Sequence, residues 1–198
     1  PGGTAAGAEL EVLLLAVSYP TPDGSRTDVV QVPLSIRREP LPGAEPALIG
    51  QLFDAVPAGS GADGTAAPGA LWIYDGVHDP EFIAAWLELM RHGGTTPSGN
   101  ATGHLVESDY LLPRATGVVK VLSGEQSNSS VIVDDGGSAA ILKFFRVLSE
   151  GQNPEVEIGA ALTAGRTAEV PSILGWVTGE WEEGPAGTQD ARTARGEL

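Results

Sequence analysis

The chain has 198 residues and not one of them is cysteine. This absence excludes disulfides, thiol catalysis and every metal site built on thiolates. Lysine is almost as scarce, because Lys120 and Lys143 are the only two among eleven basic residues and the other nine are arginine. A chain that avoids lysine this strongly raises the question of what each remaining lysine does.

Basic residues as a class are also few. The sequence has 11 basic and 26 acidic residues, so the formal net charge is −15 at pH 7. Such a field repels phosphate backbones and anionic lipid surfaces, and we therefore expect neither nucleic acid nor a membrane as partner. The longest apolar run, residues 12–17, is far shorter than the roughly 20 residues of a membrane helix. With no signal-peptide pattern, we expect a cytoplasmic protein, and this chain to be a piece of a longer one.

What the chain does contain is enough apolar surface for a core, with 41% hydrophobic and 19% charged residues. In the first half, alternating apolar residues predict an antiparallel hairpin over 10–36 with a long connecting loop. Short strands are predicted at 47–53 and 71–74. In the second half, strands are predicted at 118–122, 131–133, 140–145 and 173–181.

Two segments share one helix-start signature. Asp79-Pro80-Glu81 and Asn153-Pro154-Glu155 each combine an Asx cap, a proline at the first helical position and an acid in the first turn. The first predicts a helix that ends at Gly93 and the second a helix to about residue 164.

The predicted fold class is α+β in two parts. Residues 1–113 should form a cap of antiparallel strands and one main helix, and residues 114–198 a small lobe of antiparallel strands and one principal helix. Residues 182–198 are predicted to be an exposed, flexible tail.

Lys143 lies in a predicted strand with apolar neighbours on both sides, where a buried ammonium would need an anion. Glu157 follows fourteen residues later, in the first turns of the second predicted helix. A helix packed back on the sheet would bring Glu157 to Lys143. Upstream, backbone N–H groups of a polar loop would form an anion-binding concavity. The residues proposed for that loop are Ser123, Gly124, Gln126, Ser127, Asn128, Ser129 and Ser130.

A small-residue loop, a strand lysine and a helix glutamate follow one another in the ATP-binding part of the protein-kinase fold. The loop lacks a GxGxxG pattern, and the three features taken alone also fit an ordinary hairpin turn, a surface lysine and a solvated acid. Both interpretations stay open on pattern alone. His78, His92 and His104 show no metal-ligand spacing, and no metal site is predicted in this chain.

Longer stretches carry a resemblance. Residues 124–132 (GEQSNSSVI), 141–146 (ILKFFR) and 153–157 (NPEVE) resemble the N-lobe of actinobacterial maltokinases and their relatives. These enzymes have the aminoglycoside-phosphotransferase-like kinase fold. Residues 41–50 and 72–80 resemble the N-terminal cap domain of the same family.

The resemblance implies that Lys143 contacts ATP phosphates, that Glu157 is its ion-pair partner and that residues 123–130 cover the phosphates. It implies ATP and Mg²⁺ as cofactors and a small sugar as acceptor. The family's catalytic base and metal ligands lie in a C-lobe with an HGD-type motif, which this sequence lacks. We therefore expect no catalytic residue in this chain and no phosphoryl transfer by it alone.

The acceptor sugar is a finer question, because maltokinases phosphorylate maltose and a sister group phosphorylates glucosamine. Residues 74–80 and 145–148 resemble the glucosamine-kinase group more closely, which favours formation of glucosamine 6-phosphate. Formation of maltose 1-phosphate is the alternative. A non-catalytic binding or regulatory module of the cap type is a second alternative. The oligomeric state is left open.

Overall fold

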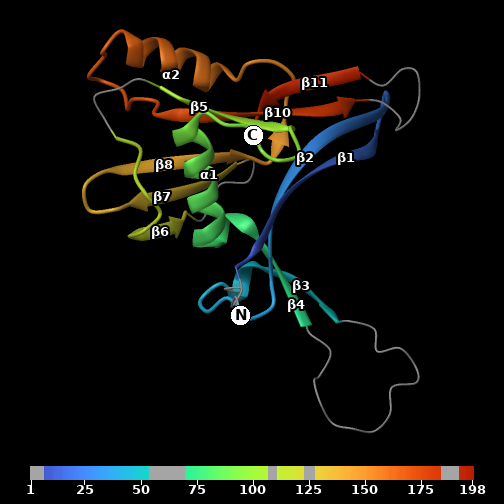
Figure 1. The fold of residues 1–198 in the computed structure, drawn as a ribbon. Coiled ribbons are helices and arrows are strands. Elements are labelled where there is room, and N and C mark those ends of the chain that lie inside the picture. The colour runs from blue at the N-terminus through green and yellow to red at the C-terminus, as the bar shows by residue number, and fades with distance from the viewer. Residues whose placement is uncertain (1–6, 54–69, 107–110, 123–127, 184–191) are drawn as a thin grey trace, which may run out of the picture.

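The computed structural model describes residues 7–53, 70–106, 111–122, 128–183 and 192–198. The described chain is α+β, with mostly antiparallel sheets and two helices, as predicted (Figure 1). The helices are α1 (Pro80–His92) and α2 (Pro154–Ala164). The strands are β1 (Glu9–Thr21), β2 (Gly24–Arg37), β3 (Leu48–Phe53), β4 (Ala70–Asp75), β5 (Ala101–Leu105), β6 (Val118–Val121), β7 (Asn128–Asp134), β8 (Ala139–Phe145), β9 (Val147–Leu148), β10 (Gly175–Glu183) and β11 (Arg192–Glu197).

The first sheet has the strand order β1-β2-β4-β3, with β9 also paired to β2. The predicted hairpin is confirmed, but its long loop is wrong, because β1 and β2 stay paired up to Thr21 and Gly24. Polar cross-strand pairs hold the far end together, among them Ser18 Oγ and Thr27 Oγ1 at 2.6 Å. Residues that are typical of turns thus extend the strands here, since their side chains find partners across the hairpin.

Helix α1 begins and ends where the sequence predicts. The carboxylate of Asp79 accepts a 2.9 Å hydrogen bond from the backbone N–H of Glu81, and Gly93 ends the helix with a φ of 58°. Strand β5 packs so closely on α1 that a Cβ added to Gly103 would lie 2.1 Å from the carbonyl oxygen of Leu89. The helix buries one apolar face, made of Phe82, Ile83, Trp86, Leu87 and Met90.

Two further sheets have the orders β6-β7-β8 and β5-β10-β11. The predicted tail over 182–198 is wrong for its last part, where β11 pairs with β10 and where Ala194 and Leu198 are buried. Gly196 lies so close to the Trp181 ring that an added Cβ would be 2.9 Å from it. Small residues make this close packing possible, although their composition by itself suggests a flexible segment. Residues 184–191 lie outside the described ranges.

The two predicted parts share one apolar core. The rings of Phe82 and Phe144 each lie near Trp86 of α1, with centroids 5.6 Å from its ring, and all three belong to the main buried cluster. Strand β5 of the first part pairs with β10, and β2 pairs with β9. The division at residue 113 remains a prediction, but the core and two strand pairings cross it. Neither α1 nor α2, the helices of the described ranges, has the length and apolarity to cross a membrane.

Candidate functional site

Lys143 lies on β8, opposite Ser130 of β7, and its side chain is 44% exposed. The expectation of a buried ammonium is wrong. Successive residues of a strand point to opposite faces, so Leu142 and Phe144 are buried while Ile141 and Lys143 share the outer face. The lysine therefore needs no partner to offset burial, and its ammonium is open to solvent.

An anion from the following helix nevertheless meets Lys143. The Nζ atom donates a 2.7 Å hydrogen bond to Oε2 of Glu155, within an ion pair whose carboxylate is 58% exposed. The structure thus brings Lys143 to the first turn of α2, as predicted, but the contacting carboxylate is that of Glu155 and not that of Glu157. Residues two apart on a helix point about 200° away from each other, so only one of the two acids can face β8. Val156 between them is buried, and Glu157 is exposed.

The start of α2 explains why Glu155 is well placed. The Asn153 side chain accepts a 2.8 Å hydrogen bond from the backbone N–H of Glu155, and Pro154 occupies the first helical position. Both features fix the first turn, from which the carboxylate reaches across to β8. The helix start was predicted from sequence, whereas the identity of the contacting acid depends on how α2 is rotated against the sheet.

The predicted phosphate loop is described only in part. Ser123, Gly124, Gln126 and Ser127 lie outside the described residues. Asn128, Ser129 and Ser130 are the first three residues of β7, and the Ser129 hydroxyl accepts a 2.9 Å hydrogen bond from Nε of Arg146. The phosphate-binding role of all seven residues remains a prediction.

A groove with a volume of about 2070 Å³ borders the Lys143–Glu155 pair. Strand β8, helix α2, the segment 165–174 and strand β10 form its walls. Much of the lining is apolar, including Ile141, Phe145, Ile158, Leu162, Ile173 and Trp176. An apolar groove with one cation on its wall is suited to a ligand that combines a flat apolar body with a negative charge.

Arg146 connects this region to the first sheet, a role that the sequence analysis missed. Its Nη2 lies 2.6 Å from Oδ2 of Asp75 at the end of β4, and its carbonyl oxygen accepts a 2.9 Å hydrogen bond from the Gln31 backbone N–H. With the bond to Ser129, one guanidinium joins β4 to β7. Arg146 lies within the stretch ILKFFR, but nothing in that stretch indicates a partner 71 residues away.

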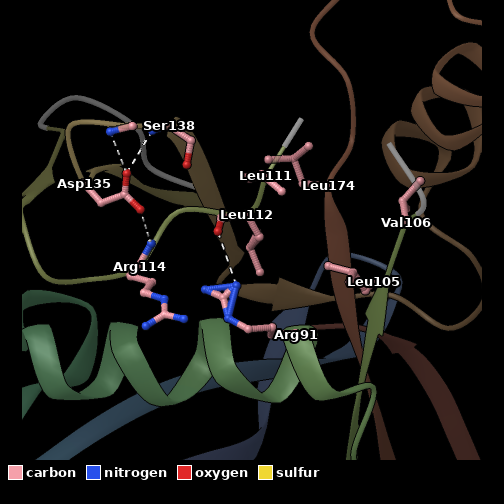
Figure 2. Close-up of a pocket in the computed structure, with 10 residues that line it drawn as sticks. Arg91, Leu105, Val106, Leu111, Leu112, Arg114, Asp135, Ser138 and Leu174 are labelled. Carbon is pink, nitrogen blue, oxygen red and sulfur yellow. Dashed lines mark hydrogen bonds between the residues drawn. The ribbon is translucent and has the colours of Figure 1, made fainter. Parts of the chain in front are cut away.

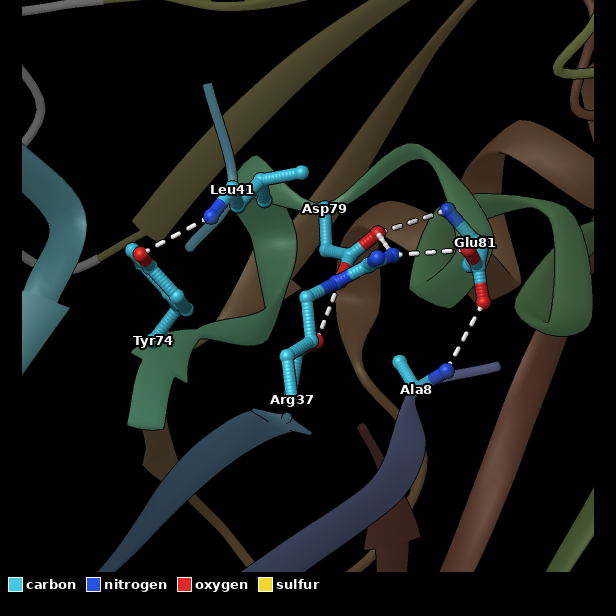
Figure 3. A network of polar contacts seen from close by, with 7 residues as sticks. Ala8, Arg37, Leu41, Tyr74, Asp79 and Glu81 are labelled. Atoms are coloured by element: carbon cyan, nitrogen blue, oxygen red, sulfur yellow. Dashed lines mark hydrogen bonds and ion pairs between the residues drawn. The ribbon is translucent and has the colours of Figure 1, made fainter. Parts of the chain in front are cut away.

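A second ionic cluster stands at the start of α1 (Figure 3). Arg37 of β2 contacts both carboxylate oxygens of Asp79 at 2.6 and 2.8 Å, and its Nη2 lies 2.8 Å from Glu81. Asp79 is fully buried and also accepts a hydrogen bond from Ser35. Burial alone would raise the pKa of Asp79, but the hydrogen bonds from Arg37, Ser35 and the Glu81 backbone outweigh it and lower the pKa.

The sequence predicted the capping role of Asp79 but not Arg37. No sequence pattern pointed to Arg37, because the burial of Asp79, which makes a nearby cation necessary, results from tertiary packing. Within the described ranges, no three side chains of the types that bind metals come together.

Comparison with known families identifies the first part of the chain. Residues 3–79 match the family model of the maltokinase N-terminal cap domain. This match confirms the resemblance stated for that part, and the chain carries a maltokinase-like N-terminal cap. The matched stretch contains β1 to β4 and ends at Asp79, the cap residue of α1.

Proposed function

We propose that this chain is the N-terminal part of a cytoplasmic, ATP-dependent sugar kinase, in which a cap precedes a nucleotide-binding lobe. The observation that carries the proposal is the sequence of features along one chain. A maltokinase-like cap over 3–79 is followed by a strand lysine whose ammonium meets a helix carboxylate beside an apolar groove.

The Lys143–Glu155 geometry supports a role in phosphate binding. An ammonium has three N–H groups and one of them points to Glu155, so within the described part of the chain two are left to meet anionic oxygens. The carboxylate restricts the lysine side chain and so orients those two donors. The adjoining apolar groove offers a surface on which the adenine base of ATP could lie. ATP bound there would supply the phosphoryl group, and the Mg²⁺ ligands and the catalytic base are expected in a C-lobe.

For the acceptor we propose glucosamine, with maltose as the alternative. The preference comes from the resemblance of residues 74–80 and 145–148 to the glucosamine-kinase group. In the structure, two of these residues make contacts that hold the fold together. The Tyr74 hydroxyl accepts a 2.9 Å hydrogen bond from the Leu41 N–H, and Asp79 is buried against Arg37. A screen of the complete gene product with both sugars and ATP decides between them, by which sugar gains a phosphate.

The central experiment replaces each of the two lysines in the complete gene product. Lys143→Ala should lower kcat/KM by about 100-fold or more, because charge neutralisation at the phosphates is lost. Lys120→Ala is the matched control, since Lys120 is also an exposed lysine on a strand of the same sheet, and it should leave turnover unchanged. Circular dichroism and the melting temperature confirm that both variants fold. Wild-type turnover in Lys143→Ala would refute the assigned role.

A second pair of variants decides which acid positions the lysine. Glu155→Gln should lower kcat/KM by roughly 10-fold, and Glu157→Gln should have a smaller effect, because Glu155 makes the contact in this structure. The reverse order would restore Glu157 as the partner in the working enzyme.

The competing proposal is a non-catalytic module that uses the cap for protein contacts. It predicts a reading frame without a catalytic-loop aspartate after residue 198, and no phosphorylation of any sugar by the gene product. A frame that continues into such a lobe supports the kinase.

A further inference from the structure

Strand β1 is an edge strand of the first sheet and has an exposed apolar face (Figure 1). It pairs with β2 on one side, and among the described residues no strand lies on its other side. Even-numbered residues of β1, among them Val12 and Leu14, pack on the main core, so the odd-numbered ones point outward. The large apolar side chains that point outward are 37–45% exposed, and they are those of Leu13, Leu15, Val17 and Tyr19. Such a row marks an interaction surface, whereas single exposed apolar side chains are ordinary.

The make-up of this edge supports the same conclusion. In a chain with 26 acidic residues, residues 12–22 hold no charged residue. Natural edge strands are usually short, bulged or charged, which prevents pairing with another chain. The opposite edge of the same sheet follows this rule, because β3 has six residues and its pairing shifts in register between Leu48 and Gly50. Strand β1 has 13 residues and pairs with β2 without a shift from Glu9 to Thr21, so it lacks these protections.

We propose that two copies of this chain associate through β1, which pairs antiparallel with β1 of the second copy about a two-fold axis at Leu15. In this register Leu15 faces Leu15 of the second copy, and Leu13 faces Val17 of the second copy. The two rows of apolar side chains then form one continuous face. The backbone N–H and C=O groups of both open edges find partners in the same step. An interface of this symmetry is closed, so association stops at two copies.

The charges on this face are self-complementary in the antiparallel direction. Its acids, Glu9 and Glu11, stand at one end of the apolar row, and Arg26 stands at the other end, opposite Tyr19 in the hairpin. Antiparallel pairing about Leu15 puts Glu11 of one copy against Tyr19 of the other. Parallel pairing would instead put the acids of the two copies side by side, where like charges repel. The charge pattern therefore favours a second, antiparallel copy as the occupant of the edge.

Arg26 is placed to meet the incoming acid. Its side chain is 64% exposed, and its guanidinium carbon lies over the Tyr19 ring, 6.0 Å from the centroid and so toward the open edge. Its ion pair with Asp28 uses Nε at 2.8 Å, so in the described part of the chain the two terminal nitrogens are left for a second carboxylate. Glu11 of the second copy, opposite Tyr19, would lie beside them.

Sedimentation of the full chain tests the proposal. Each copy carries a net charge of −15, so the measurement uses about 0.3 M NaCl, which shortens the Debye length to about 6 Å and screens the mutual repulsion. Between about 1 and about 100 µM the chain should reach twice the mass of one copy and no more. A monomer throughout this range, or association beyond two copies, would overturn the proposal. A monomeric complete gene product would also overturn it, since another part of a longer chain would then cover β1.

A lysine on the two-fold axis should break the dimer. Leu15→Lys should weaken association at least about 10-fold, because it places two ammonium groups opposite each other. Leu111→Lys is the matched control and should leave the dimer intact. Leu111 is 77% exposed and lies beside Leu174, outside the first sheet (Figure 2). Circular dichroism checks that both variants fold, as expected for exposed positions. An equal loss of association in both variants would point to unspecific apolar contact and refute the interface.

Single cysteines test the register, since the chain has no cysteine of its own. On oxidation, Leu15→Cys should link two copies through a disulfide, because residue 15 faces itself across the axis. Val17→Cys should not, because its two sulfurs would be offset by four residues, about 13 Å along the strands, whereas a disulfide spans Cα atoms less than about 7 Å apart. Linkage of Val17→Cys without linkage of Leu15→Cys would refute the register. No sugar or ATP enters these measurements, so they are independent of the proposed kinase.

Discussion

The starts of α1 and α2 are two versions of the same arrangement. Each begins with an Asx cap, a proline and a glutamate, and in each the glutamate meets a cation on a strand. Arg37 lies 2.8 Å from Glu81, and Lys143 lies 2.7 Å from Glu155. The local sequence rules for a helix start are thus satisfied twice, with nearly the same contact distance.

Burial separates the two. At α1 the cap is an aspartate with a fully buried side chain, and Arg37, only 16% exposed, contacts both its carboxylate oxygens. At α2 the cap is a neutral asparagine, and the exposed fractions of Lys143 and Glu155 are 44% and 58%. The comparison teaches that a buried, multiply bonded pair is costly to break by removing one partner, whereas an exposed single contact leaves its cation available for a ligand.

The largest expected effect is on the buried cluster. Asp79→Ala should lower the free energy of unfolding by about 3 kcal/mol, because it removes a cap and leaves Arg37 partly buried without its main partner. Urea denaturation measures the change. The corresponding cap variant at α2, Asn153→Ala, should cost about 1 kcal/mol. Equal losses in the two variants would contradict the distinction between the helix starts.

Arg146 should show an intermediate effect, because its pair with Asp75 is partly buried. Arg146→Met should lower the free energy of unfolding by about 2 kcal/mol, since charge-assisted hydrogen bonds to Asp75 and Ser129 are lost. A double-mutant cycle with Asp75→Asn should give a coupling energy of about 1 kcal/mol. A coupling near zero would mean that the ion pair does not help to join the first sheet to β7.

Acid should weaken the α1 cluster specifically. The pKa of Asp79 is lowered in the folded protein, so its contribution to stability is present above the unfolded pKa of about 3.9 and is lost as the pH falls through the lower folded value. Unfolding free energies measured from pH 6 down to pH 2.5 should therefore decline less steeply in Asp79→Asn than in the unaltered protein. Parallel pH profiles would show that Asp79 titrates alike in the folded and unfolded states.

The smallest expected effect on stability is at α2. Glu155→Gln should change the free energy of unfolding by less than about 0.5 kcal/mol, because an exposed ion pair is screened by water and salt. Thermal and urea unfolding at low and high salt measure it. A loss above about 1 kcal/mol would place the Lys143–Glu155 pair with the structural cluster and weaken its assignment to ligand binding.

Sequence patterns predicted the elements better than their partners. Both helix starts, the first hairpin and the strands around Lys143 could be located, because caps, prolines and alternation act within a few residues. The loop of the hairpin and the tail after residue 182 were mispredicted, since turn-type and small residues adopt strand geometry when a neighbouring strand accepts them. Strand β11 depends on contacts with Trp181 and Ser149 that no local pattern encodes.

The candidate site was predictable to the same degree. The sequence pointed to Lys143 and to the first turn of α2, but not to Glu155 rather than Glu157, because that choice depends on the rotation of a helix about its axis. The contacts of Arg37 and Arg146 were missed because their partners lie 42 and 71 residues away.

By itself, the amino-acid sequence determined the absence of thiol chemistry, the acidic net charge, the two helix starts and the choice of Lys143, one of only two lysines, as a candidate site residue. Tertiary structure decided which carboxylate meets Lys143 and how far each ion pair is buried. The physical reason is the distance along the chain over which each kind of interaction acts. Caps and alternation are satisfied within one or two turns of chain, whereas burial and charge pairing depend on groups brought together from distant parts of the sequence.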